Sequence, residues 1–118
     1  MIAYVSGPYS APTEEQRQAN IDRARAVAEE LWAAGYAVIC PHMNTAHMDD
    51  SGLSKDVFLA GDLEFVLVSD LIVLLPGWQT SEGARLEARF AMNHHKKVCE
   101  YPTVPLPDNP ILHFSKGK

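Results

Sequence analysis

Hydrophobic and polar residues follow two alternating patterns along this chain. Short, mostly apolar runs, each followed by a proline or glycine, predict buried strands over residues 2–6, 36–40, 71–75 and 97–101. Between these runs, apolar residues recur at spacings of three and four, which predicts helices over about residues 14–34, 55–69 and 82–94. Strands that alternate with helices indicate a parallel sheet with right-handed crossovers.

The predicted helices carry recognisable capping residues. Thr13 opens a capping-box sequence at the start of the first helix, and Gly35 stands where that helix is expected to end. Ser54 is placed to cap the second helix, and either Thr80 or Ser81 the third. The apolar stripe of the first helix comprises Ile21, Ala24, Val27, Ala28 and Leu31.

Two segments show neither pattern. Residues 41–52 are polar and irregular, so we expect a loop there. Residues 102–118 contain four prolines, which favours an extended C-terminal tail after one domain of residues 1–101. A chain of 118 residues fits one domain and leaves no room for a second core.

The predicted strands are apolar on both faces, as in a sheet that helices cover on both sides. The expected fold is therefore a doubly wound parallel sheet of flavodoxin-like order, a three-layer α/β/α domain. That order places the first and third strands side by side, so that residues 7–10 face residues 76–81. Both loops are rich in glycine, serine and aromatic residues. Ligands bind beyond the carboxyl ends of such strands, which predicts a site between these loops.

Composition excludes several classes of protein. The formal net charge of −5 argues against a broad basic face for polymeric nucleic acid. The longest apolar run, residues 71–76, is too short to span a membrane. The chain opens directly on a strand pattern, so we expect no secretory signal peptide. Cys40 and Cys99 form no disulfide framework, which favours a reducing cytoplasm.

The third predicted helix carries the most informative residue. Its broad apolar arc comprises Ala84, Leu86, Ala88, Phe90 and Ala91. Glu87 falls inside this arc, and a carboxylate on a core-facing side is costly unless it is paired or takes part in chemistry. Gly83, one turn earlier, leaves space beside it. Two interpretations stay open, a functional carboxylate or a glutamate paired with an arginine at the helix edge.

The second predicted helix is apolar almost all round. Its apolar residues are Val57, Phe58, Leu59, Leu63, Phe65, Val66, Leu67 and Val68. Such a helix needs two buried faces, which predicts that one face packs on a partner subunit in a homodimer or larger homo-oligomer. Asp62 lies between Phe58 and Val66 on this helix and, taken alone, is interpreted as a solvated acid at the margin of a stripe.

Metal and polyphosphate sites are not favoured. His42, His47, Asp49 and Asp50 share one loop, but their spacing matches no compact ligand motif, and we expect no metal. Residues 7–10 match neither a Walker loop nor GxGxxG, which disfavours a nucleoside triphosphate or a dinucleotide. Free amides at the starts of the first and third helices remain suited to one phosphate. For residues 7–10 the alternative is a plain tight turn.

Several short motifs, in matching order and spacing over residues 2–101, resemble the nucleoside 2-deoxyribosyltransferase superfamily. They are Tyr4-Val5-Ser6-Gly7, Asp62-Leu63-Glu64-Phe65, Ser69-Asp70-Leu71 and Ser81-Glu82-Gly83-Ala84-Arg85-Leu86-Glu87. A little-characterised branch is similar in its Gly7-Pro8-Tyr9 start, Asn20, Pro41-His42 and Leu75-Pro76-Gly77-Trp78. The resemblance implies a flavodoxin-like sheet, an oligomer, and cleavage of the N-glycosidic bond of a nucleoside or nucleoside monophosphate.

The resemblance also implies roles for individual residues. Glu87 matches the nucleophilic glutamate of the superfamily, Tyr4 the tyrosine that orients it, and Asp62 an aspartate that acts on the sugar or the leaving base. Where the transferases usually carry an aspartate, six residues before the glutamate, this sequence has Ser81. It is similar in this to the deoxynucleoside 5′-monophosphate N-glycosidases, whose serine contacts the phosphate, which favours a hydrolase.

These residues suit the reaction without any cofactor. Cleavage of a glycosidic bond passes through an oxocarbenium-like state, which a carboxylate stabilises or traps, while a second carboxyl group protonates the departing base. The candidate substrate-binding residues lie in the surrounding loops: Gly7, Tyr9, Ser10, Arg17, His42, Gly77, Trp78, Ser81 and Gly83. Arg17, near the start of the first helix, either holds a phosphate or is an ordinary surface arginine.

Two other classes of function stay open. The first is a module that binds or senses a nucleotide derivative on this fold without catalysis, and fold alone does not separate it from an enzyme. Glu87 on an apolar face favours catalysis, whereas a pocket blocked by Trp78 would favour sensing. The second is an interaction protein that uses the apolar second helix.

Overall fold

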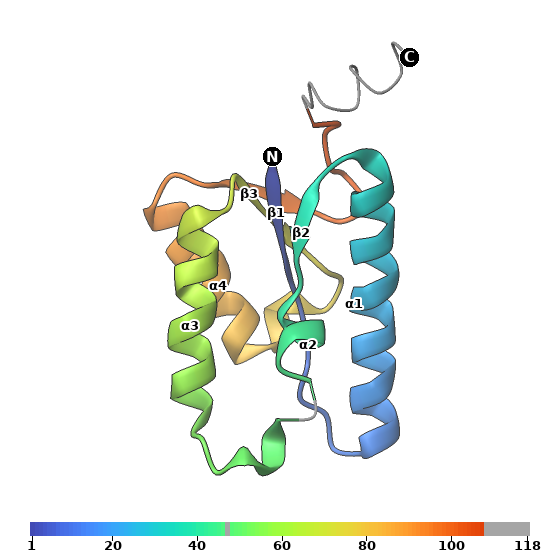
Figure 1. Cartoon of the computed structure of the whole chain (residues 1–118), viewed down its shortest axis with the longest axis vertical. Coiled ribbons are helices and arrows are strands. Elements are labelled where there is room, and N and C mark those ends of the chain that lie inside the picture. The colour runs from blue at the N-terminus through green and yellow to red at the C-terminus, as the bar shows by residue number, and fades with distance from the viewer. Residues whose placement is uncertain (47, 108–118) are drawn as a thin grey trace.

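A four-stranded sheet forms the centre of the computed structural model, which describes residues 1–46 and 48–107. All pairings are parallel, and the order is β2-β1-β3-β4 (Figure 1). The strands are β1 (Ile2–Ser6), β2 (Ala37–Ile39), β3 (Leu71–Leu74) and β4 (Lys97–Glu100). Because β1 and β3 are neighbours, the predicted doubly wound, flavodoxin-like order is confirmed.

Helices cover both faces of this sheet. They are α1 (Glu14–Ala34), α2 (Pro41–Asn44), α3 (Lys55–Val68) and α4 (Glu82–Asn93). In Figure 1, α1 lies on one side of the strands, and α3 and α4 lie together on the other. Two short 3-10 turns, Asp49–Ser51 and Trp78–Thr80, lie in the connections. The three layers agree with the predicted α/β/α architecture.

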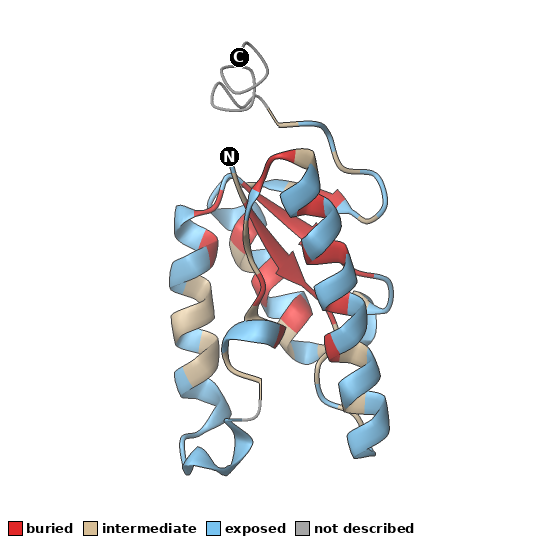
Figure 2. Ribbon diagram, turned by 45° about the vertical axis from the view of Figure 1, so that its right-hand side comes forward, coloured by how far each residue is buried: buried red, intermediate tan, exposed pale blue. Residues whose placement is uncertain are grey.

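The alternation of side chains along β1 divides the core into two. Ala3 and Val5 pack with the buried side of α1, whereas Tyr4 packs with Val66 of α3 and Ala88 of α4. Figure 2 shows the buried residues gathered along the strands, with the outer sides of the helices exposed. Successive residues of a strand point to opposite faces, so β1 contributes to both cores at once.

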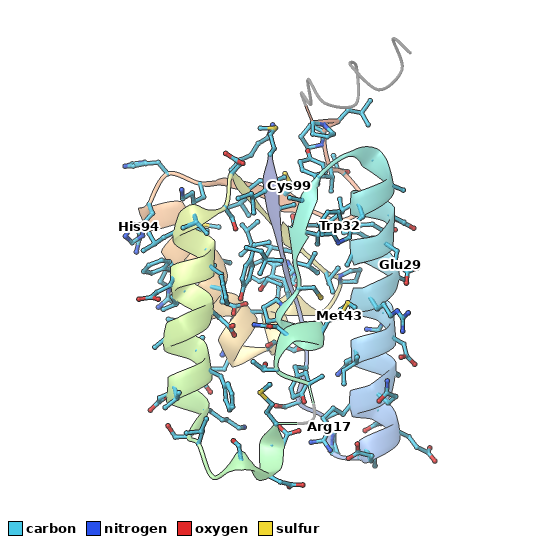
Figure 3. All side chains as sticks on the ribbon, viewed as in Figure 1. Arg17, Glu29, Trp32, Met43, His94 and Cys99 are labelled. Carbon is cyan, nitrogen blue, oxygen red and sulfur yellow. The ribbon has the colours of Figure 1, made fainter. Side chains whose placement is uncertain are left out.

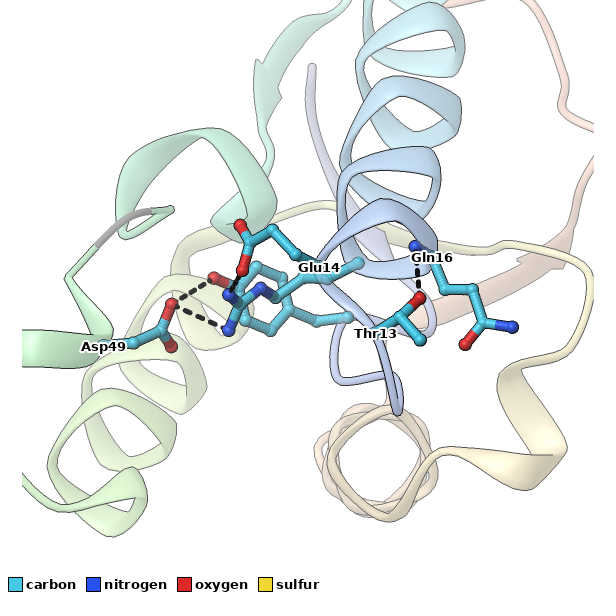
Figure 4. A network of polar contacts seen from close by, with 6 residues as sticks. Thr13, Glu14, Gln16 and Asp49 are labelled. Carbon is cyan, nitrogen blue, oxygen red and sulfur yellow. Dashed lines mark hydrogen bonds and ion pairs between the residues drawn. The ribbon is translucent and has the colours of Figure 1, made fainter.

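Helix α1 forms as its local sequence dictates. The side chain of Thr13 accepts a hydrogen bond from the Gln16 amide at 3.1 Å (Figure 4), and Gly35 ends the helix in the left-handed region with φ of 106°. The five residues of its predicted stripe are all buried. This helix was predictable because both of its ends carry capping residues and its 3.6-residue spacing repeats over many turns.

The prediction of an irregular loop over residues 41–52 is wrong in part. Helix α2 occupies its first four residues and the 3-10 turn Asp49–Ser51 lies near its end. Pro41 stands at the first position of α2, where its fixed φ suits a helix and its missing N–H costs nothing. Four residues are too few for a periodic pattern, so the sequence did not indicate this turn of helix.

Smaller corrections concern the other two helices. Leu86, expected in the apolar arc of α4, is 37% exposed, because it lies at the margin of that arc. Ser81 caps α4, whereas the hydroxyl of Thr80 donates to the carbonyl of Gly77 instead. Ser54 occupies the cap position of α3 but makes no side-chain capping bond.

Helix α3 buries only one of its two apolar sides. Val66 is its one fully buried residue, while Val57, Phe65, Leu67 and Val68 are exposed. The predicted contact of this helix with a partner subunit stays a prediction. Within residues 1–46 and 48–107, no helix has the length and hydropathy of a membrane span. His47 and residues 108–118, most of the predicted tail, lie outside the described residues.

Candidate active site

Glu87 lies on the side of α4 that faces the sheet. Helix α4 begins immediately after Ser81, whose side chain accepts a hydrogen bond from the Ala84 amide at 3.2 Å. Starting the helix there directs Glu87 inward together with Ala84, Ala88 and Ala91, and only 7% of Glu87 is exposed. The structure thus buries the carboxylate that the sequence pattern singled out.

Two hydroxyl groups from β1 hold this carboxylate. The phenol of Tyr4 donates to Oε2 of Glu87 at 2.7 Å, and the hydroxyl of Ser6 donates to Oε1 at 2.6 Å. Tyr4 and Ser6 are two residues apart on a strand, so both side chains point toward α4. Both oxygens of Glu87 are therefore bound by short, buried hydrogen bonds, and within residues 1–46 and 48–107 no arginine forms an ion pair with it.

Two opposing effects act on the pKa of Glu87, and the net result is a raised value. Burial raises the pKa of Glu87, and the hydrogen bonds from Ser6 and Tyr4 oppose that rise. The pKa of Tyr4 is raised strongly, first by burial and then by the charges of Glu87 and Asp62, so its phenol stays neutral and donates. Hydrogen bonds to the ionised form are the main device that keeps a buried carboxylate charged.

Asp62 brings a second carboxyl group close enough to interact with Glu87. It lies on α3, half-buried, and its pKa is raised to about 7 by burial and by the charge of Glu87. Near neutral pH Asp62 therefore carries a proton much of the time, and the charge of Glu87 helps to hold that proton there. Two carboxyl groups whose environments separate their pKa values form a typical acid and nucleophile pair.

The two cysteines offer no competing nucleophile. Cys40 and Cys99 are free and buried. Burial raises the pKa of both thiols, that of Cys40 to about 11. A buried thiol that stays protonated at neutral pH is a poor nucleophile, because the thiolate is the reactive form.

The loops after β1 and β3 approach each other closely. A Cβ on Gly7 would lie 2.7 Å from Cβ of Leu75, so only glycine fits there. Gly77 adopts a φ of 88°, which also favours glycine, and a Cβ there would contact Pro8 at 3.4 Å. Gly83, in contrast, has open space where a side chain would be. Gly7 and Gly77 therefore allow the two loops to pack closely, whereas Gly83 leaves open space one turn before Glu87.

Tyr9 and Arg17 belong to a polar network at the start of α1, together with Glu14 and Asp49, which are labelled in Figure 4. Arg17 forms ion pairs with Glu14 and, at 3.3 Å, with Asp49 of the 3-10 turn. The phenol of Tyr9 donates to the same carboxylate oxygen of Asp49 at 3.1 Å. The guanidinium of Arg17 is thus bound by two carboxylates, which occupy the positions that an anionic ligand would take.

His42 is buried against the loop after β1 and holds it by a hydrogen bond. It is 4% exposed, and its Nε2 donates to the carbonyl oxygen of Pro8 at 2.7 Å. The ring of Tyr9 meets it edge-on, with ring centres 5.7 Å apart. Burial lowers the pKa of His42, which favours the neutral ring. Its place in the structure is that of a buried support for residues 8 and 9.

The remaining predicted residues border the same end of the sheet. Ser10 is exposed in the loop after β1, and Ser81 lies at the start of α4. The indole of Trp78 donates to a carboxylate oxygen of Glu100 on β4 at 3.0 Å, and its ring packs against the core beneath α4. Among the described residues, no group of three potential ligands is placed to hold a metal ion.

Ser6 binds Glu87, but the sequence pattern indicates it only as part of a strand and of a short motif. Period-two alternation from Tyr4 places Ser6 on the face of β1 that meets α4, so a signal for it was present. Asp49 binds both Tyr9 and Arg17, contacts that its place in a polar loop does not indicate.

Comparisons with known proteins agree with this fold. The sequence matches, over residues 1–100, the family described as "Domain of unknown function (DUF4406)". No curated protein matches it. Similar solved structures include two 2-deoxyribosyltransferases.

The first, the 2-desoxiribosyltransferase of Leishmania mexicana, has a TM-score of 0.57 at 13% identity, over 85% of this chain and 63% of that one. The second, the 2-deoxyribosyltransferase of the psychrotolerant bacterium Bacillus psychrosaccharolyticus, has a TM-score of 0.63 at 20% identity, over 92% of this chain and 77% of that one. This chain thus spans less than two thirds of the Leishmania enzyme. At such identities the likeness shows a shared fold.

Proposed function

The chain belongs to the DUF4406 family, and we propose that it is an enzyme that cleaves the N-glycosidic bond of a (deoxy)nucleoside or its 5′-monophosphate. The observation that carries this proposal is the buried Glu87, held by two hydroxyl groups beside a second carboxyl group with a raised pKa. The fold shared with two 2-deoxyribosyltransferases supports the same reaction class.

In the first step, an oxygen of Glu87 forms a bond to the anomeric carbon of the sugar. The bond from that carbon to the base nitrogen breaks, and its electron pair leaves with the base. Asp62 transfers its proton to the departing base and becomes a carboxylate. The positive charge that develops on the sugar is stabilised by the negative charge of Glu87.

In the second step, an acceptor attacks the same carbon and releases Glu87. The acceptor is water in hydrolysis and a second base in transfer. The carboxylate of Asp62 takes the proton that the acceptor loses, so the site returns to its starting state. Tyr4 keeps its hydroxyl on Glu87 and orients the carboxylate throughout.

A 5′-monophosphate is the proposed form of the substrate. The start of α4 presents free backbone amides, and the hydroxyl of Ser81 accepts from the Ala84 amide while keeping its own hydrogen to donate. Arg17 adds a positive charge, and in the proposed complex it exchanges Asp49 for the phosphate. Ser81 in place of a base-contacting aspartate favours hydrolysis as the second step.

Incubation with a panel of nucleosides and 5′-monophosphates tests this proposal. The products are separated by chromatography, with and without a second free base in the mixture. Release of free base is the expected result, and formation of a new nucleoside would identify transfer as the second step. If no member of the panel releases its base, the proposed activity is wrong.

A further inference from the structure

We propose that Ser6 is a positioning residue for Glu87, which fixes the carboxylate together with Tyr4 and keeps its charge in place. This inference rests on the proposed function for its catalytic meaning, since it takes Glu87 as the nucleophile. Its physical part concerns only the protonation and orientation of Glu87. Sequence reasoning gave Ser6 no role.

The position of Ser6 is fixed by its backbone. Its carbonyl oxygen accepts a hydrogen bond from the Leu75 amide at 2.8 Å, and its partner across the sheet is Leu74. The next residue, Gly7, packs so closely on Leu75 that no side chain fits. With 1% of Ser6 exposed, the hydroxyl has little freedom, and its oxygen lies 2.6 Å from Oε1 of Glu87.

One hydroxyl alone would not fix the carboxylate. The last torsion of a glutamate side chain is broad, so a carboxylate held only at Oε2 by Tyr4 still turns about that contact. The bond from Ser6 to Oε1 removes this rotation, because both oxygens are then held from one strand. Glu87 therefore presents its carboxylate in one orientation before any substrate binds, which is a prerequisite for efficient attack.

The same two bonds favour the ionised form of Glu87. A hydroxyl donates to an oxygen without a proton, so two donors on Glu87 favour its ionised form. The titratable groups that act on Glu87 are Tyr4 from β1 and Asp62 from α3, and the thiol of Cys40 acts on Tyr4 in turn. On α4 itself, Arg85 and Arg89 are exposed on the other side. The Ser6 hydroxyl thus favours the negative charge on Glu87, and this charge in turn raises the pKa of Asp62.

The test compares Ser6→Ala with a matched control, Ser69→Ala. Ser69 is as buried as Ser6 and donates to the carbonyl of Phe65 at 2.8 Å, so its loss has a similar structural cost without touching Glu87. The readout is the titration of the Glu87 carboxyl carbon by NMR, which needs no substrate. Ser6→Ala is expected to move this titration about one pH unit upward, and Ser69→Ala to leave it unchanged.

Kinetics with the best substrate of the panel provide the second readout. Ser6→Ala is expected to lower kcat about tenfold with little change in KM, because binding does not depend on the charge of Glu87 alone. If Ser6→Ala does not fold, Ser6→Cys keeps the shape and weakens the donor, and a smaller upward shift is expected.

A Glu87 titration that is the same in wild type and in the folded Ser6 variant overturns the inference. So does an equal shift in Ser69→Ala. Because the titration is independent of activity, a shift without any base release would support the role of Ser6 and contradict the proposed function instead.

Discussion

Replacement of Asp62 by asparagine separates the proposed acid from the proposed nucleophile. Asp62 has a pKa of about 7 in the folded chain, against an ordinary value of 3.8, because of burial and the charge of Glu87. If its proton assists the departing base, the activity follows the protonated fraction. With this pKa, that fraction falls about tenfold between pH 6 and pH 8. The base-release rate of the wild type is expected to fall by the same factor.

The asparagine side chain has a similar shape but no proton to give. At pH 6, Asp62→Asn is expected to lower the rate on the order of a hundredfold or more, the usual contribution of a general acid. What activity remains should not change between pH 6 and pH 8. Glu64→Gln is the matched control, an exposed acid-to-amide change two residues further along α3, and it should retain the wild-type profile.

The pH dependence of the folding stability tests the raised pKa of Asp62 independently of activity. Between about 3.8 and 7 the folded state binds more protons at Asp62 than the unfolded state does, so stability falls as pH rises through this window. Asp62→Asn removes this loss. The variant should therefore gain melting temperature relative to wild type at pH 8 and gain less or none at pH 5. A wild-type rate that is flat or rises from pH 6 to pH 8, with no such stability difference, would refute the reasoning.

Three further predictions use other parts of the structure. Tyr4→Phe removes one of the two hydrogen bonds to Glu87 and should lower kcat roughly ten- to a hundredfold in steady-state assays, whereas an unchanged kcat would remove its orienting role. The exposed apolar side of α3 predicts a homodimer or larger assembly, which light scattering at micromolar concentration contradicts if it finds only monomers. Ser81 at the start of α4 predicts that 5′-monophosphates bind more tightly than the matching nucleosides in calorimetry. Equal affinities would contradict a phosphate site there and favour a transferase.

The features that the sequence predicted well are those that depend on neighbours along the chain. The stripe and caps of α1 need only helical spacing, Thr13 and Gly35. The position of Glu87 on the inner side of α4 follows from the same helical spacing, and Ser81, one of the two expected caps, starts the helix. The parallel order of the strands follows from their alternation with helices, since few topologies remain once crossovers are right-handed.

The features that the sequence did not predict depend on contacts between distant elements. The bond from Ser6 to Glu87 joins residues 81 positions apart, and it exists only because β1 and α4 pack in one register. The ion pair of Arg17 with Asp49 depends in the same way on where the 3-10 turn lies. Helix α2 is a local element, but its four residues are too few to show a helical spacing of apolar residues, so the sequence did not indicate it.

The apolar groove beside β2 shows a related limit of sequence reasoning. It has a volume of about 400 Å³ and is bordered by residues of α1, α2 and α3, among them Trp32 and Met43 (Figure 3). Trp32 is 58% exposed and Met43 51% exposed. Trp32 lies outside the predicted apolar stripe of α1, and Met43 lies in the segment that was expected to be a loop. Only the folded chain brings the two residues together.

The most direct test of the central claim is base release by Glu87→Gln under saturating substrate. The glutamine keeps the size and polarity of the side chain but removes the negative charge that attacks the sugar. If Glu87 is the nucleophile, turnover should fall on the order of a thousandfold or more, several kcal/mol of barrier, and by more than in Tyr4→Phe. A Glu87→Gln enzyme with near-normal turnover would contradict the account and move the chemistry to another residue, with Asp62 the next candidate.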